Sequence, residues 1–276
     1  MTKTLPKDLS SYDFLKAIAI ILMVTDHMGH FFYPDETWWR IFGRLCVPIW
    51  FFLIGYARTR EIPKTIWLGA GVLVLSSLIS GQYLFPLNIL FGLMAARYAI
   101  DGIAKRALRT GETLAGMFFL LFLLSYPSML AVEYGTMGAL FSLFGYIVRN
   151  REEAPFRKMP IFLFMVGSVF VYTIGQAVML ATLSWPQFTV LLLGTIFVCM
   201  LLSVFQPVTF PRLTKAMTFP VASVFRLLGR HTLLIYVLHL LLFRAVAMYL
   251  FPDRFGFLEW SFFTPGTGDY LQSIFF

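Results

Sequence analysis

Long apolar stretches recur along almost the whole chain and are separated by short polar segments. Each stretch runs for roughly 17 to 25 residues, which lets an α-helix cross a hydrocarbon core of about 30 Å. The expected spans lie near 14–33, 43–57, 63–80, 86–104, 113–130, 132–148, 160–183, 187–205 and 231–251. The pattern predicts an all-α polytopic membrane protein of about nine transmembrane helices, organised as a single domain over residues 1–276.

The segments between the expected spans alternate in their content of Lys and Arg. The basic set comprises the N-terminal segment and the connections near 58–64, 105–109, 149–158 and 212–230. The other connections contain little more than Arg40, Arg44 and Arg254. Because basic residues accumulate on the cytoplasmic side, we expect a cytoplasmic N-terminus, a C-terminus outside and therefore an odd number of spans.

Composition narrows the possible functions. Apolar residues make up 59% of the chain and charged residues only 13%, which excludes an ordinary soluble domain. The net charge of +8 is spread over several connections, so we expect no nucleic-acid partner. Cys46 and Cys199 stand in separate apolar stretches without a metal-ligand spacing, and we expect no metal site.

The first expected span carries three ionisable side chains, Asp26, His27 and His30. An ionisable group at this depth is costly unless it is paired or hydrated, which suggests a functional site. An Asp beside a His can orient the imidazole, which would make His27 a general base with Asp26 as its partner. The alternative is a polar helix end that is hydrogen-bonded near the outer headgroups, and His30 fits this alternative better than His27 does.

The last expected span contributes His239 near the middle of the membrane and Arg244 farther out. Because they are five residues apart, they point to different sides of a helix. Near the cytoplasmic ends of the spans lie the cations Lys16, Arg97, Arg226 and Arg230. Arg97 lies about two turns inside its span, where anchoring of the topology does not explain it.

Two segments carry a recognisable pattern, DFLKAIAIILMVTDHMGHFF at 13–32 and RLCVPIWFFLIGYARTR at 44–60. They are similar to the opening helices of the TraX-like proteins, which acetylate the N-terminus of conjugative pilin. Shorter similarities occur at 88–91 and 133–138, and 228–239 resembles the last helix of the wider acyltransferase-3 superfamily. Little family character is visible between 159 and 225 or after Pro252.

The resemblance implies a multi-pass acetyltransferase of the bacterial inner membrane. It would move acetyl from cytoplasmic acetyl-CoA to an acceptor at the outer face, with the N-terminal amine of a pilin as the expected acceptor and a glycan or a lipid as alternatives. In this interpretation His27 and Asp26 are catalytic, and the CoA phosphates bind Lys16, Arg97, Arg226 and Arg230. Candidate contacts to the acceptor or to the developing oxyanion are His30, Arg44, Asn88, His239 and Arg244.

Two other classes of function fit the residues taken alone. In a proton-coupled transporter or flippase, Asp26, His27, His30 and His239 would relay protons. In a structural or assembly protein of the lipid bilayer, the same groups would only join helices by hydrogen bonds. Binding of acetyl-CoA would separate the transferase from both alternatives.

Overall fold

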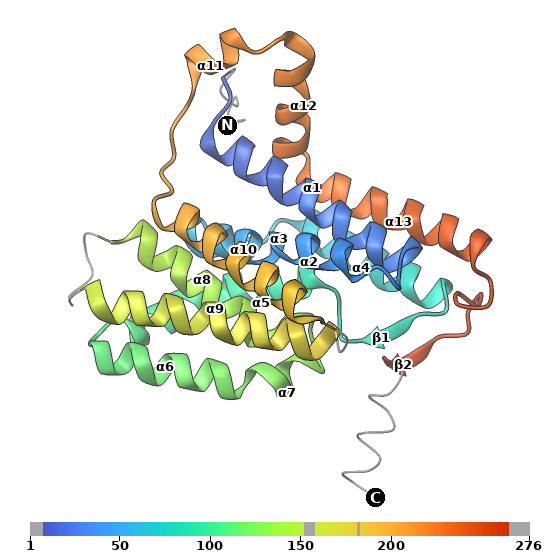
Figure 1. The fold of residues 1–276 in the computed structure, drawn as a ribbon, viewed down its shortest axis with the longest axis horizontal. Coiled ribbons are helices and arrows are strands. Elements are labelled where there is room, and N and C mark those ends of the chain that lie inside the picture. The colour runs from blue at the N-terminus through green and yellow to red at the C-terminus, as the bar shows by residue number, and fades with distance from the viewer. Residues whose placement is uncertain (1–7, 152–157, 181–182, 265–276) are drawn as a thin grey trace, which may run out of the picture.

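The structure is a computed structural model that describes residues 8–151, 158–180 and 183–264, and it shows a helical bundle with one small sheet (Figure 1). The helices are α1 (Ser11–Phe32), α2 (Thr37–Arg44), α3 (Cys46–Tyr56), α4 (Lys64–Ile79), α5 (Ile89–Ala107), α6 (Gly111–Leu123), α7 (Ser125–Met129), α8 (Gly135–Arg149), α9 (Lys158–Leu180), α10 (Trp185–Ser203), α11 (Pro211–Ala216), α12 (Phe219–Arg230) and α13 (Thr232–Leu250). Strands β1 (Tyr83–Phe85) and β2 (Ser261–Phe263) pair in parallel. The predicted helical class is therefore correct for most of the described chain, but the sequence did not predict this sheet.

Five of the described helical segments are long and apolar enough to cross a membrane. They are α1, the segment Thr37–Tyr56 formed by α2 and α3, α9, α10 and α13. Helices α4 and α6 are apolar but shorter. The chain is thus a helical membrane protein. The count of nine spans and the sides of the termini stay predictions, and both chain ends lie outside the described residues.

The second span begins earlier than the hydrophobic pattern predicts. It was expected over 43–57, but helix α2 already begins at Thr37 and includes Arg40 and Arg44. Both guanidinium groups form ion pairs with Asp26 of α1. Hydropathy alone excludes charged residues from a span, whereas pairing with a carboxylate on a neighbouring helix reduces the cost of burying them.

Helices α3 and α8 pack closely against each other. In Figure 1, α1 and α13 run side by side above α9 and α6, and α5, α7 and α8 also lie in the lower part. At the crossing, a Cβ atom on Gly55 of α3 would overlap the backbone carbonyl of Ser142 on α8. The Ser142 hydroxyl donates a hydrogen bond to the carbonyl of Phe51 at 3.0 Å. Glycine is therefore required at Gly55, because any side chain would push the two helices apart.

The beginning of α1 is tied to the end of α12. Ser10 and Asp13 form a capping box that satisfies the first amides of α1. The carboxylate of Asp13 also accepts a hydrogen bond from Nε of Arg230 at 3.2 Å. Both residues of this ion pair line a cavity of the bundle.

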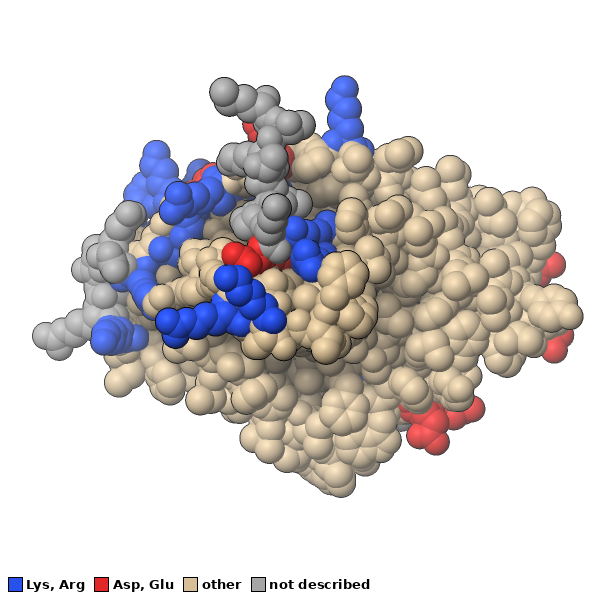
Figure 2. All heavy atoms as spheres, turned by 90° about the horizontal axis from the view of Figure 1, so that it is seen from above, with Lys and Arg blue, Asp and Glu red and all other residues tan. Residues whose placement is uncertain are grey.

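Charged side chains are distributed unevenly over the surface. Figure 2 shows most of the visible Lys and Arg side chains toward the left end of the molecule, whereas isolated Asp and Glu side chains lie at the right end. By the positive-inside rule, we expect the basic end to lie on the cytoplasmic side.

Candidate functional site

Two cavities meet inside the bundle. The larger, of about 760 Å³, follows the N-terminal part of α1, and the smaller, of about 510 Å³, follows its C-terminal part. Both cavities are lined by Asp26, His27, Glu133, Tyr134 and Tyr236. A ligand in either cavity can therefore reach the same small group of polar side chains.

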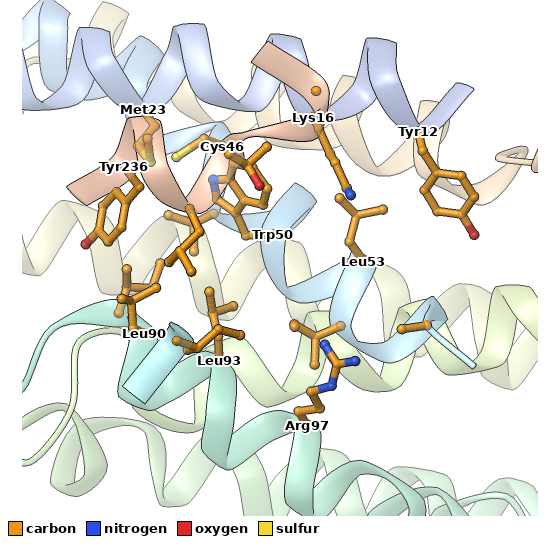
Figure 3. Close-up of a pocket in the computed structure, with 18 of the residues that line it drawn as sticks. Tyr12, Lys16, Met23, Cys46, Trp50, Leu53, Leu90, Leu93, Arg97 and Tyr236 are labelled. Atoms are coloured by element: carbon orange, nitrogen blue, oxygen red, sulfur yellow. The ribbon is translucent and has the colours of Figure 1, made fainter. Parts of the chain in front are cut away.

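The larger cavity is cationic at one end and apolar along its walls. In Figure 3, Lys16 points into it from α1 and Arg97 from α5, with Leu53 between them, and Trp50 and Leu93 lie between this pair and Tyr236. The indole nitrogen of Trp50 is buried without a hydrogen-bond partner in the described structure. The cavity thus offers two cations, an apolar lane and an unused hydrogen-bond donor.

Three of the four cations that the sequence assigns to donor binding line this cavity. Arg97 donates from Nη2 to the carbonyl of Thr59 at 3.0 Å, and its buried Nε has no partner among the described residues. Lys16 and Arg230 also line the cavity, although Arg230 is engaged by Asp13. Arg226 is different, because its side chain folds back to the carbonyl of Ala222 on its own helix and lines neither cavity. The expected contact of Arg226 with the donor is therefore not supported by its position.

The imidazole of His27 is hydrogen-bonded to His239. Nδ1 of His27 lies 2.7 Å from Nε2 of His239, and Nδ1 of His239 lies 2.7 Å from the carbonyl oxygen of Ile235. The planes of the two rings are inclined by 28°, with centroids 4.9 Å apart. Helix α13 therefore supplies the group that orients His27.

The carbonyl of Ile235 determines how the protons are arranged. A carbonyl oxygen can only accept a hydrogen bond, so Nδ1 of His239 must carry a proton. In neutral His239, Nε2 is then the acceptor, and Nδ1–H of His27 donates to it. This assignment leaves the lone pair of neutral His27 on Nε2, which is the state that a general base or a nucleophile requires.

Asp26 does not orient His27, which corrects the expectation from the sequence. Its carboxylate lies 3.0 Å from Nη1 of Arg40 and 3.4 Å from Nε of Arg44, the latter contact being an ion pair without a hydrogen bond. Arg44 also donates to the hydroxyl of Tyr134. The reason is geometric, because consecutive residues of an α-helix do not face the same neighbour. Asp26 faces α2, whereas His27 faces α13.

The smaller cavity collects most of the other candidates. His30, Arg44, Asn88 and Arg244 all line it, and Asn88 also caps α5 and donates to the carbonyl of Ala70. Arg244 donates from Nη1 to the carbonyl of Leu73 at 2.7 Å and to the hydroxyl of Ser76. His239 and Arg244 do point to different sides of α13, as their spacing predicts.

Several residues at this site were not identified as site residues from the sequence. Arg40 was assigned to a connection, and Glu133, Tyr134, Tyr236 and Trp50 received no role. One signal was present, since Arg40 and Arg44 are four residues apart and share a face of α2. Tyr236 and Trp50 carry no such signal, because aromatic residues are abundant in every span of this chain.

Comparison with known proteins places the whole site inside a family domain. The chain matches the family model described as TraX protein over residues 11–247. The chain belongs to the TraX family.

One relative of this TraX-family chain is described without a function. An uncharacterized protein of Rickettsia prowazekii (strain Madrid E) is 28% identical over 145 residues, which cover 51% of this chain and 56% of that protein. The match therefore spans just over half of the relative. No solved structure matches the chain.

Proposed function

We propose that this TraX-family protein is an acetyl-CoA-dependent acetyltransferase of the bacterial inner membrane. It moves acetyl from the cytoplasm to an acceptor at the outer face, with the N-terminal amine of a pilin as the expected acceptor. The observation that carries the proposal is the place of His27 at the meeting of two cavities of different chemistry, with an Nε2 that makes no hydrogen bond to the described residues.

The larger cavity suits the donor. Lys16 and Arg97 provide cations for the phosphates of CoA, and the apolar lane beyond them matches the thin pantetheine arm. The indole N–H of Trp50 is available to a carbonyl oxygen of that arm. In this arrangement the acetyl thioester lies at the inner end of the cavity, next to His27 and Tyr236.

The proposed chemistry is direct transfer assisted by His27. Nε2 of His27 takes a proton from the acceptor amine or hydroxyl while the acceptor atom forms a bond to the thioester carbonyl carbon. The tetrahedral intermediate then breaks its bond to sulfur, and the thiolate leaving group takes the proton from the imidazolium of His27. The products are the acetylated acceptor and CoA. Because the proton returns, His27 ends each cycle neutral.

Substitution of His27 tests this function. His27→Ala should reduce acetyl transfer by on the order of 10²-fold or more, because it removes the general base. Binding of acetyl-CoA should change little, because the lost interaction is made mainly in the transition state. The assay is transfer of radiolabelled acetyl to pilin by the protein in nanodiscs, with thermal stabilisation by acetyl-CoA as the binding measurement.

His231→Ala is the matched control, because His231 is exposed and lines neither cavity. It should behave as the wild type. Near-normal transfer by His27→Ala at saturating acceptor would remove His27 as the base. A protein that acetyl-CoA does not stabilise would not be an acetyl-CoA transferase at all.

A proton-coupled transporter or flippase is the second candidate. The hydrogen bond from His27, which lines both cavities, to His239 on α13 also has the form of a proton relay. The two functions predict different measurements. Proton flux into proteoliposomes that depends on His27, without any stabilisation by acetyl-CoA, would favour the transporter.

A further inference from the structure

Arg244 is a buried cation whose hydrogen-bond donors are only partly used in the described structure. The residue is only 9% exposed and lines the smaller cavity. Its hydrogen bonds go to the carbonyl of Leu73 and the hydroxyl of Ser76, which are both uncharged, and both leave from Nη1. Its Nε is buried without a partner, and no ion pair joins Arg244 to a described carboxylate. The edge formed by Nε and Nη2 is therefore available to a ligand.

The smaller cavity as a whole also has an excess of positive charge. The charged residues that line it are Arg40, Arg44, Arg244, Asp26 and Glu133. Asp26 is shared by Arg40 and Arg44, and Glu133 accepts a hydrogen bond from the amide of Ile89 at 3.0 Å. Three guanidinium groups thus face two carboxylates. In a membrane interior such an excess is costly unless an anion or water compensates it.

We propose that the smaller cavity is the acceptor site and that it takes an acceptor carrying a carboxylate or a phosphate, which Arg244 binds through Nε and Nη2. This inference rests on the proposed transferase function. The side edge of a guanidinium presents two parallel N–H groups, and these match the two oxygens of a carboxylate or phosphate. Because His27 lines the same cavity, an acceptor anchored in this way has its nucleophile near Nε2.

A stable anion fits Arg244 better than the transient oxyanion of the reaction does. The oxyanion exists only during transfer, whereas the unpaired cation is present in the resting protein. A ground-state anion would compensate this charge each time the acceptor binds, and the gain would appear as affinity. An oxyanion contact would appear in kcat instead.

Small amines that differ only in their anionic group test the proposal. The full-length protein in nanodiscs is titrated with β-alanine, with O-phosphoethanolamine and with the neutral-tailed 3-aminopropan-1-ol, and binding is measured from the rise of Tm. The first two should stabilise the protein and the third should not. Arg244→Gln should weaken binding of the anionic probes at least tenfold, which is about 1.4 kcal/mol. The matched control is Arg106→Gln, an exposed residue of α5 that lines neither cavity and should bind them as the wild type does.

Each outcome decides the question. Stabilisation by only one of the two anionic probes supports the proposal and identifies the anion. Equal stabilisation by all three probes in the wild type overturns it, even if Arg244→Gln does not fold. Unchanged probe binding in a folded Arg244→Gln variant also overturns it, and a loss confined to kcat would assign Arg244 to the oxyanion.

Stabilisation by acetyl-CoA is measured in parallel. If acetyl-CoA fails to stabilise the protein while the anionic probes bind through Arg244, the transferase function fails and the anion site stands.

Discussion

Nδ1 of His27 lies 2.7 Å from Nε2 of His239, although 212 residues separate them in the chain. The contact joins the first and the last long helix of the described structure, α1 and α13. Because His239 is itself held by the carbonyl of Ile235, the protons of both rings are assigned by one backbone acceptor. His239 is thus a positioning residue for His27. Both of its hydrogen bonds are made within the protein and do not depend on a bound substrate.

Replacing His239 should lower turnover without weakening donor binding. His239→Ala removes the acceptor for Nδ1–H of His27, so the imidazole loses its orientation, and we expect kcat to fall on the order of 10²-fold. His239→Gln should retain more activity, because its amide oxygen can accept the same hydrogen bond. The measurement is steady-state acetyl transfer at several acetyl-CoA concentrations. Equal activity of the Ala and Gln variants would contradict the positioning role.

Asp26 should matter chiefly for stability. Asp26→Asn removes the ion-pair partner of the buried Arg44 and the partly buried Arg40, and breaking a buried pair in this way costs about 3–5 kcal/mol. The control is Asp101→Asn, which removes the exposed partner of Arg60 and should cost under about 1 kcal/mol. Unfolding by SDS titration in bicelles measures both changes. A loss no larger for Asp26→Asn than for Asp101→Asn would show that the pair is not needed for folding.

Arg97 should act on donor affinity. If it contacts a phosphate of acetyl-CoA equally in the ground state and the transition state, Arg97→Ala should raise KM about tenfold and leave kcat unchanged. Arg106→Ala on the same helix is the control, since Arg106 is exposed and donates only to the carbonyl of Gly102. Kinetics of acetyl transfer to pilin give both constants. An unchanged KM would exclude Arg97 from the donor site.

The crossing of α3 on α8 should tolerate no side chain at Gly55. Gly55→Ala would place a Cβ against the carbonyl of Ser142, and we expect a loss of about 1–3 kcal/mol from this overpacking. Gly71→Ala is the matched control, because no atom lies within 4 Å of its added Cβ. That change should be neutral or stabilise α4 by up to about 1 kcal/mol. Thermal unfolding in the same detergent compares the two, and equal Tm values would refute the close crossing.

The predicted topology is testable with single cysteines. Cys46 and Cys199 are free and buried, so a variant with both changed to Ala provides the background. Arg151→Cys should be protected from an impermeant maleimide in intact spheroplasts and react only after lysis, whereas Glu259→Cys should react from outside. Labelling of both positions from the same side would overturn the odd number of spans that is predicted between residues 151 and 259.

The sequence by itself determined that the chain is a helical membrane protein, where most of its helices lie and which side chains are too polar for a bilayer without a reason. These features depend on local properties, namely the hydropathy of about 20 consecutive residues and the positions of charged groups among them. The resemblance of 13–32 and 44–60 to TraX-like proteins was also visible in the sequence, and the family match over 11–247 confirms it.

Only the tertiary structure decided which polar groups meet. Sequence spacing determines the face of a helix on which a residue lies, but it does not determine which neighbouring helix packs against that face. Asp26 and His27 are adjacent in the chain and were expected to form a pair, yet Asp26 pairs with Arg40 and Arg44 while His27 pairs with His239. The two residues have different partners because α2 and α13 pack against different sides of α1. Each buried polar group must find its partner on the helix that covers it.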